Sequence, residues 1–170
     1  MKKPKTAQES LTVMTNIVLP NETNSLGNLF GGELLARMDR AAAIAATRHS
    51  EKRVVTASVN HVSFNHPIPV GSIVIVEAKV TRAFTTSMEV YCDVWLDDPI
   101  LGKKIHTNDG IYTFVAVDEF TKPVPIPALI PETEQEIERH AAAFRRKELS
   151  LILSGRMKAA DSVELRKLFV

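Results

Sequence analysis

The chain has 170 residues, of which 45% are hydrophobic and 24% are charged. This length fits one domain, and the apolar content is sufficient for a buried core. The 21 basic and 20 acidic residues give a formal net charge of +1. No field of one sign therefore favours nucleic acid or an anionic membrane surface as a partner.

Cysteine content and the start of the chain narrow the class of protein further. Cys92 is the single cysteine, which excludes an intramolecular disulfide and a zinc site built on cysteines. Its place in an alternating run favours a buried structural role. The opening segment, MKKPKTAQESLTVMT, lacks the apolar stretch of a secretory signal, and no run approaches the length of a membrane span. We expect a cytoplasmic protein without a bound metal.

A change in periodicity divides the first part of the chain into a strand, a loop and a helix. Ser10 to Val18 is rich in Thr, Val, Ile and Met, which predicts a strand. The segment PNETNSLGNLFGG follows, with the composition of a loop that contains tight turns. From Glu33 to about Arg48 the period becomes 3.6, which predicts a helix. The apolar arc of this helix comprises Leu34, Leu35, Met38, Ala41, Ala42 and Ala45.

Downstream of the helix the hydrophobic period is 2, which indicates β-strands. Alternation is clear from Ser72 to Ala83 and from Ser87 to Leu96, and a β-branched apolar run covers Ile111 to Val117. Arg53 to Phe64 is a less regular candidate. Turn signals rich in Pro, Gly and Asp separate these segments, so an antiparallel meander is the simplest arrangement.

One helix beside several antiparallel strands is an α+β layer arrangement. The apolar arc of the helix must cover one face of the sheet, and its alanines would let the sheet curl closely around it. The pattern therefore predicts the hotdog fold, in which an antiparallel sheet of five to six strands is wrapped around a central helix.

The C-terminal part is expected to lie outside this fold. The run PVPIPALIPE contains four prolines and predicts an extended connector. Glu132 to Leu153 has a helical pattern with Thr133 as a possible cap, and Asp161 to Val170 could form a short final helix. We assign residues 1–125 to the main domain and residues 126–170 to the proline-rich connector and a C-terminal helical extension.

Asp39 is the first candidate for a reactive side chain. It lies at the edge of the apolar arc of the first helix, beside alanines that leave space for a ligand. A partly desolvated carboxylate in such a place suits a general base. The alternative, which the helix pattern alone favours, is a boundary aspartate that bonds a nearby backbone group or arginine.

The loop before the helix offers groups that could stabilise negative charge. The Asn24 amide could donate to a carbonyl oxygen, although a turn-forming role is the simpler explanation of an asparagine there. Gly31 and Gly32 lie where the loop enters the helix, and helix-terminal N–H groups attract an oxyanion. A strained loop closure explains these glycines equally well. His61 and His66 could line a pocket or occupy ordinary polar positions.

The sequence lacks the motifs of other common enzyme classes. It contains no G-x-S-x-G nucleophile elbow, no phosphate-binding loop of the G-x-x-x-x-G-K-[ST] type, no G-x-G-x-x-G fingerprint and no H-E-x-x-H pair.

The segment from Asn24 to Asp39, NSLGNLFGGELLARMD, resembles the acyl-CoA thioesterases of the brain acyl-CoA hydrolase group and their short bacterial relatives. Its pattern, N-x-x-G-x-x-F-G-G followed six residues later by Asp, is specific. Further matches lie at residues 59–64, 66–71 and 86–89, and the resemblance covers roughly residues 10–125. The last fifteen residues have no counterpart in it.

This resemblance implies hydrolysis of acyl-CoA thioesters to a free fatty acid and coenzyme A, with no cofactor beyond the coenzyme A of the substrate. It also implies homo-oligomers, commonly hexamers built as trimers of dimers. Their active site lies between two subunits, so Asn24 of one chain would face Asp39 of the other. Asp39 would act as general base or nucleophile, and Asn24 with backbone groups near Gly31 and Gly32 would stabilise the oxyanion.

Contacts to coenzyme A are predicted by position in the matching segments. The four candidates are Phe64, Arg82, Thr86 and Ser87. Arg82 is the obvious partner of a phosphate. Phe84 and Thr85 depart from the Gly-Arg pair of some bacterial relatives, which leaves phosphate recognition at this point open.

Two other functions on the same scaffold stay open. One is a non-catalytic acyl-CoA-binding sensor, although the sequence shows no helix-turn-helix or basic arm as an output module. The other is a hotdog dehydratase of hydroxyacyl thioesters, whose chemistry usually pairs an acid with a nearby histidine. No such histidine accompanies Asp39 in its helix.

Overall fold

The computed structural model describes residues 3–164 and 167, and the chain forms two compact units. The first unit, Met1–Ile130, contains the sheet and the helix predicted to pack against it. The second unit, Pro131–Val170, contains the predicted C-terminal helix. In the described part of the chain, no helix is long and apolar enough to cross a membrane.

The first unit is built on a five-stranded antiparallel sheet with the strand order β2-β4-β5-β6-β3. Its strands are β2 (Thr12–Ile17), β3 (Arg53–Ser63), β4 (Ile73–Ala83), β5 (Ser87–Asp98) and β6 (Lys103–Val117). Each of the expected strands is present. β6 begins at Lys103 rather than at Ile111, because its first half is polar and shows no apolar alternation.

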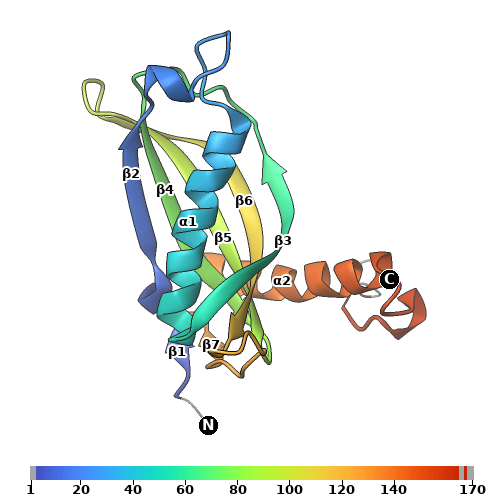
Figure 1. Ribbon diagram of the computed structural model, residues 1–170. Coiled ribbons are helices and arrows are strands. Elements are labelled where there is room, and N and C mark those ends of the chain that lie inside the picture. The colour runs from blue at the N-terminus through green and yellow to red at the C-terminus, as the bar shows by residue number, and fades with distance from the viewer. Residues whose placement is uncertain (1–2, 165–166, 168–170) are drawn as a thin grey trace. The chain divides into compact units, whose positions relative to one another are not determined.

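Helix α1 (Gly31–Ser50) lies against the concave face of this sheet, which curves around it from β2 to β3 (Figure 1). The small side chains on its buried face let the strands approach closely, and four of them are completely inaccessible to solvent: Ala41, Ala42, Ala45 and Ala46. The hotdog fold predicted from periodicity is therefore confirmed. The helix begins at Gly31 rather than Glu33, because both glycines belong to its first turn.

The core lies between α1 and the inner face of the sheet. Alternate residues of the central strands point into it, among them Val76, Val90 and Phe114, all at most 1% exposed. Cys92 is buried in the same layer, as expected, and its burial raises the pKa of the thiol. The period of 2 in the sequence thus follows from one buried face of the sheet.

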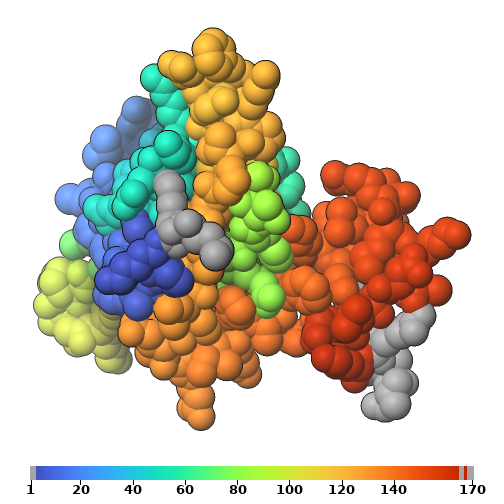
Figure 2. Space-filling view, turned by 90° about the horizontal axis from the view of Figure 1, so that it is seen from below, coloured from blue at the N-terminus to red at the C-terminus, as the bar shows by residue number. Residues whose placement is uncertain are grey.

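A small parallel sheet joins the start of the first unit to its end. β1 (Lys5–Thr6) pairs with β7 (Leu129–Ile130), which lies in the extended proline-rich connector. The two segments meet at the end of the unit seen in Figure 2. His49, near the end of α1, donates from Nε2 to the carbonyl oxygen of Pro127 at 2.9 Å. These contacts fix the connector beside the C-terminal end of α1.

The second unit contains helix α2 (Glu134–Leu153), close to the predicted range. Thr133 caps it as expected: its side chain accepts from the N–H of Glu136, whose carboxylate accepts in turn from Thr133 N–H. Of the predicted final helix, Ser162 to Glu164 are not helical, and residues 165–166 and 168–170 lie outside the described residues. A short 3₁₀ turn, Ala159–Asp161, precedes them.

Candidate active site

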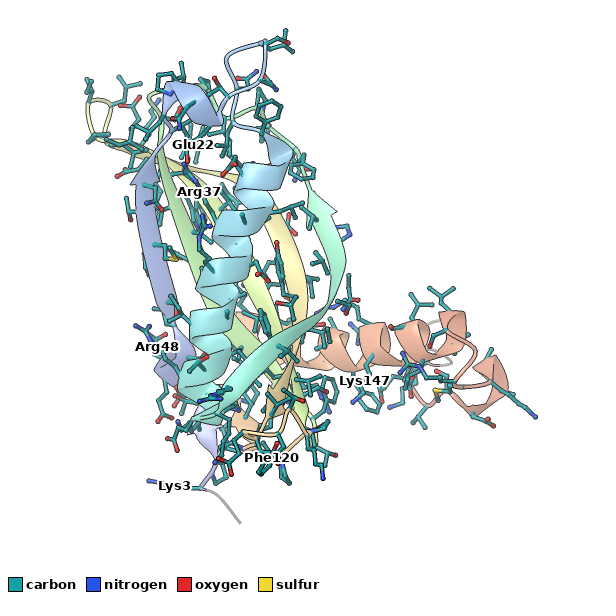
Figure 3. All side chains as sticks on the ribbon, in the orientation of Figure 1. Lys3, Glu22, Arg37, Arg48, Phe120 and Lys147 are labelled. Carbon is teal, nitrogen blue, oxygen red and sulfur yellow. The ribbon has the colours of Figure 1, made fainter. Side chains whose placement is uncertain are left out.

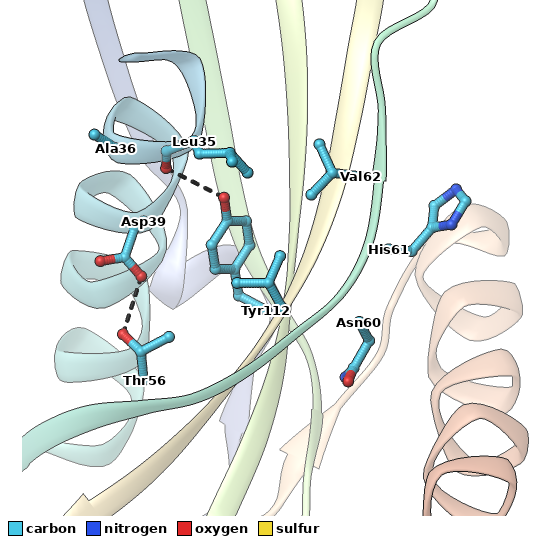
Figure 4. A pocket seen from close by; sticks show the side chains of 9 residues that line it. Leu35, Ala36, Asp39, Thr56, Asn60, His61, Val62 and Tyr112 are labelled. Atoms are coloured by element: carbon cyan, nitrogen blue, oxygen red, sulfur yellow. Dashed lines mark hydrogen bonds between the residues drawn. The ribbon is translucent and has the colours of Figure 1, made fainter. Parts of the chain in front are cut away.

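Asp39 projects from α1 into a pocket between this helix and β3 (Figure 4). Its Oδ1 accepts a hydrogen bond from the Thr56 hydroxyl at 2.9 Å. The pocket has a volume of about 550 Å³ and is lined by Leu35, Ala36, Asp39, Thr56, Val59, Asn60, His61, Val62 and Tyr112. Asp39 therefore combines an apolar setting with access to a ligand, which is the arrangement a general base requires.

Thr56 is a functional candidate that the sequence did not reveal, because threonine is an ordinary strand residue. It lies beside a register shift in the pairing of β3 with β6, and a second shift follows between Val59 and His61. Such bulges bend a strand and redirect its side chains. They also explain why this segment showed the least regular alternation in the sequence.

Asn24 occupies a tight loop held by its own side chain. Its Oδ1 accepts from the N–H groups of Leu26 and Asn28 at 2.9 and 3.2 Å, and Gly27 allows the turn with φ of 72°. Among the described residues, Nδ2 of Asn24 makes no hydrogen bond. The turn-forming role and the donor role considered for Asn24 are therefore compatible, because they use different atoms.

A second pocket, of about 260 Å³, lies beside this loop and the start of α1. Asn24, Gly31, Phe64 and His66 are among its lining residues. A Cβ added at Gly31 would lie 3.3 Å from the Phe64 ring, so glycine permits this close contact, whereas Gly32 has open space beside it. The first three N–H groups of α1 have no acceptor within the helix, and the side chain of its N-cap residue, Phe30, supplies none.

Within one chain, the predicted site residues fall into separate groups. Asp39 lines the first pocket, whereas Asn24, Gly31 and Phe64 line the second. The remaining coenzyme A candidates lie at or next to the hairpin between β4 and β5 and line neither pocket: Arg82, Thr86 and Ser87. The Arg82 guanidinium lies 5.8 Å from the centre of the Phe84 ring. A single copy of the chain therefore does not assemble the predicted site.

Comparison with known proteins places this architecture in a family. Residues 26–103 match the profile of the Thioesterase superfamily. The uncharacterized acyl-CoA thioester hydrolase YkhA of Bacillus subtilis is 40% identical over 148 residues, which are 86% of each chain. The chain belongs to the hotdog-fold acyl-CoA thioesterases.

Solved structures of this family have the same fold. An acyl-CoA hydrolase of Staphylococcus aureus, in complex with butyryl-CoA, coenzyme A and coenzyme A disulfide, superposes with a TM-score of 0.83 at 37% identity over 86% of this chain and 89% of that one. An apo-hexameric acyl-CoA thioesterase gives a TM-score of 0.83 at 38% identity over 95% of this chain and 100% of that one.

Variants of the Staphylococcus aureus thioesterase add an observation on spacing. Its solved structures include alanine variants of an aspartate, an asparagine and a threonine. The intervals between those three residues along its chain equal the intervals between Asn24, Asp39 and Thr56 here.

In the present chain, an ion pair between Glu22 and Arg37 fastens the Asn24 loop to α1 (Figure 3). The buried Arg37 guanidinium donates to both carboxylate oxygens of Glu22 at 2.9 and 2.8 Å. Glu22 also accepts from the N–H of Leu19 with its carboxylate, and from the N–H of Phe30 with its carbonyl oxygen. The base of the loop is therefore held to the helix that carries Asp39. The Leu19 N–H and then the Arg37 side chain lower the pKa of Glu22.

We expect Glu22→Gln to lower the free energy of unfolding at neutral pH by about 1–3 kcal/mol, because it weakens a charge-assisted pair to a buried arginine. The pKa of Glu22 is lowered in the folded state, so its contribution is present above the pKa of an unfolded glutamate and is lost as the pH falls through the folded-state value. The difference from wild type should therefore close in acid. Denaturant unfolding at a series of pH values measures it.

Glu77→Gln is the matched control, since it breaks the more exposed pair between Glu77 and Lys104. It should change stability by less than about 1 kcal/mol. An equal effect of the two substitutions at neutral pH would contradict the anchoring role of Glu22.

Proposed function

We propose that this chain hydrolyses acyl-CoA thioesters to a free acid and coenzyme A, in active sites that two copies of the chain build together. The observation that carries the proposal is the Asp39 carboxylate, which is held by Thr56 in a largely apolar pocket. Membership of the acyl-CoA thioesterase family and the related structure with butyryl-CoA support this substrate class.

Strand β3 supports the contribution of a second copy. It is an edge strand of the sheet in the described part of the chain, and it exposes Val55 and Val59 at 46% and 47%. A long edge strand with apolar side chains is suited to pairing with another strand. If β3 pairs with β3 of a second copy about a two-fold axis, the Asp39 pocket of one chain can face the Asn24 loop of the other. We propose that such dimers associate as trimers of dimers, and hexameric relatives support this assembly.

The proposed mechanism uses the Asp39 carboxylate oxygen that makes no hydrogen bond to Thr56. Thr56 binds Oδ1 of Asp39, which leaves Oδ2 to face the substrate. As a general base, Asp39 takes a proton from water while the water oxygen attacks the thioester carbon. As a nucleophile, Oδ2 attacks that carbon directly and the resulting anhydride is then hydrolysed. In both routes the C–S bond breaks and coenzyme A leaves as a thiolate that takes up a proton.

Negative charge on the carbonyl oxygen needs donors on the other side of the substrate. We propose that Nδ2 of Asn24 and the backbone N–H groups near Gly31 and Gly32 supply them from the partner chain. The hydrogen bonds that fix Oδ1 of Asn24 support this role, because they hold the amide in one orientation before the substrate binds. Donors that are positioned in advance lose little free energy to reorganisation in the transition state.

The contacts to coenzyme A remain part of the proposal. Phe64 lies beside Gly31 and lines the second pocket. Arg82, Thr86 and Ser87 lie away from both pockets of their own chain, so we assign them to coenzyme A bound at a site of another subunit. We further propose that the enzyme acts in the cytoplasm, binds neither nucleic acid nor a membrane, and needs no separate cofactor. The near-neutral formal charge supports the absence of a nucleic-acid partner.

Asp39→Ala should lower kcat at least about a thousandfold, because it removes the group that activates the nucleophile. Asn24→Ala should lower kcat about a hundredfold through the loss of one oxyanion donor. A thiol-release assay with acyl-CoA substrates measures both, with light scattering to confirm the oligomer. Asn21→Ala, at an exposed asparagine three residues before Asn24, should retain wild-type activity. Near wild-type turnover by Asp39→Ala would refute the proposed function.

Thr56→Val should lower kcat about tenfold and change KM little, because it removes only the hydrogen bond that orients Asp39. The matched control is Thr113→Val on β6, since the Thr113 hydroxyl bonds Asn60 and not Asp39. Steady-state kinetics of both variants measure these changes in kcat and KM. If the two variants lose activity equally, the hydrogen bond from Thr56 to Asp39 has no specific role.

A further inference from the structure

Tyr112 forms the back wall of the Asp39 pocket. It projects from the inner face of β6 into the space between α1 and β3, opposite Val59 in the strand pairing (Figure 4). Its side chain is buried, with the residue 1% exposed, although it is one of the residues that line the pocket. The ring therefore closes the pocket toward the core of the protein.

Several contacts hold this ring in place. The Tyr112 hydroxyl donates to the carbonyl oxygen of Leu35 at 3.2 Å, in the helical turn that leads to Asp39. A Cβ added at Gly110 would lie 3.2 Å from both Tyr112 Cε2 and Met38 Sδ, so the glycine provides the space in which the ring and Met38 lie. Burial raises the pKa of Tyr112, so the hydroxyl stays protonated and keeps its hydrogen bond.

The position of Asp39 decides which part of a substrate meets Tyr112. The thioester carbon must lie beside the Asp39 carboxylate, at the side of the pocket where Thr56 holds it. The hydrophilic coenzyme A portion extends toward solvent, so the acyl group is directed along the apolar walls. Leu35, Ala36 and Val62 are apolar residues that line this pocket, and the buried Tyr112 ring lines it too.

We propose that the Tyr112 ring sets the depth of the acyl pocket and thereby limits the length of the acyl chain that this enzyme accepts. The proposal rests on the function proposed above, since it assigns the acyl group to the Asp39 pocket. A longer chain meets a ring that is fixed on both sides, by Leu35 at the hydroxyl and by Gly110 and Met38 at the ring edge. Repacking a filled core to admit further methylene groups is unfavourable.

The test compares kcat/KM for butyryl-, octanoyl- and palmitoyl-CoA in the intact oligomer. Wild type should discriminate among the three chain lengths. Tyr112→Leu opens the back wall and should raise the ratio of octanoyl to butyryl activity by about tenfold or more, since an apolar pocket discriminates even a single methylene group by at least about this factor. Tyr112→Phe keeps the ring and should keep the wild-type ratio. Tyr112→Met also removes the ring but leaves a longer side chain than leucine. It is used in place of Tyr112→Leu if that variant does not fold.

Phe114→Leu is the matched control. Phe114 lies two positions further along β6, on the same inner face and equally buried, but it does not line the pocket. Its substitution should cost similar stability and leave the chain-length ratio unchanged. The proposal is overturned if Tyr112→Leu and Tyr112→Met shift the ratio no more than Phe114→Leu does. Failure of wild type to hydrolyse any of the three substrates would instead contradict the proposed function itself.

Discussion

Helix α1 has to pack one face against the sheet and present polar side chains on its other sides, and the rest of the structure depends on this constraint. Its alanine face is buried against the sheet, which can curve around it only because these side chains are small. Arg37 and Asp39 lie about 200° apart around the helix axis, so they point to different sides of it. Arg37 fastens the loop that carries Asn24, and Asp39 enters the pocket beside β3. One rigid element thus fixes both halves of the proposed chemistry.

The same geometry supports the proposal that two copies of the chain build each active site. Because the two side chains point to different sides of α1, Asn24 and Asp39 line separate pockets. An edge strand with exposed valines borders the Asp39 pocket. A two-fold pairing along this edge would cover the valines and complete the site in one step. Assembly and catalysis would then be coupled. A dissociated chain would carry half of each of two sites and no complete site.

Much of the fold follows from periodicity, because the buried faces repeat along the sequence. The spacing of the alanines in α1 and of the alternating apolar residues in β4 and β5 directly indicates which faces of these elements are buried. The polar first half of β6, from Lys103, is missed because it shows no apolar alternation and register there is set by hydrogen bonds to β5.

The site was less accessible to sequence reasoning than the fold. Asp39 and Asn24 stand out through a specific motif, but Thr56 and Tyr112 do not. Their roles depend on two register shifts in β3 and on the hydrogen bond from Tyr112 to the Leu35 carbonyl, which joins residues far apart in the sequence. Contacts of this kind leave no periodic signal, so only the three-dimensional arrangement reveals them.

The central claim is that each active site takes Asn24 from one chain and Asp39 from another, and mixing two inactive variants tests it most directly. A dimer of an Asn24→Ala chain with an Asp39→Ala chain contains one site in which both residues are intact. Differently tagged variants, dissociated and reassembled together, should recover about a quarter of wild-type activity if pairing is random. If the mixed oligomers are as inactive as their parents, each chain carries its own site and the account is wrong.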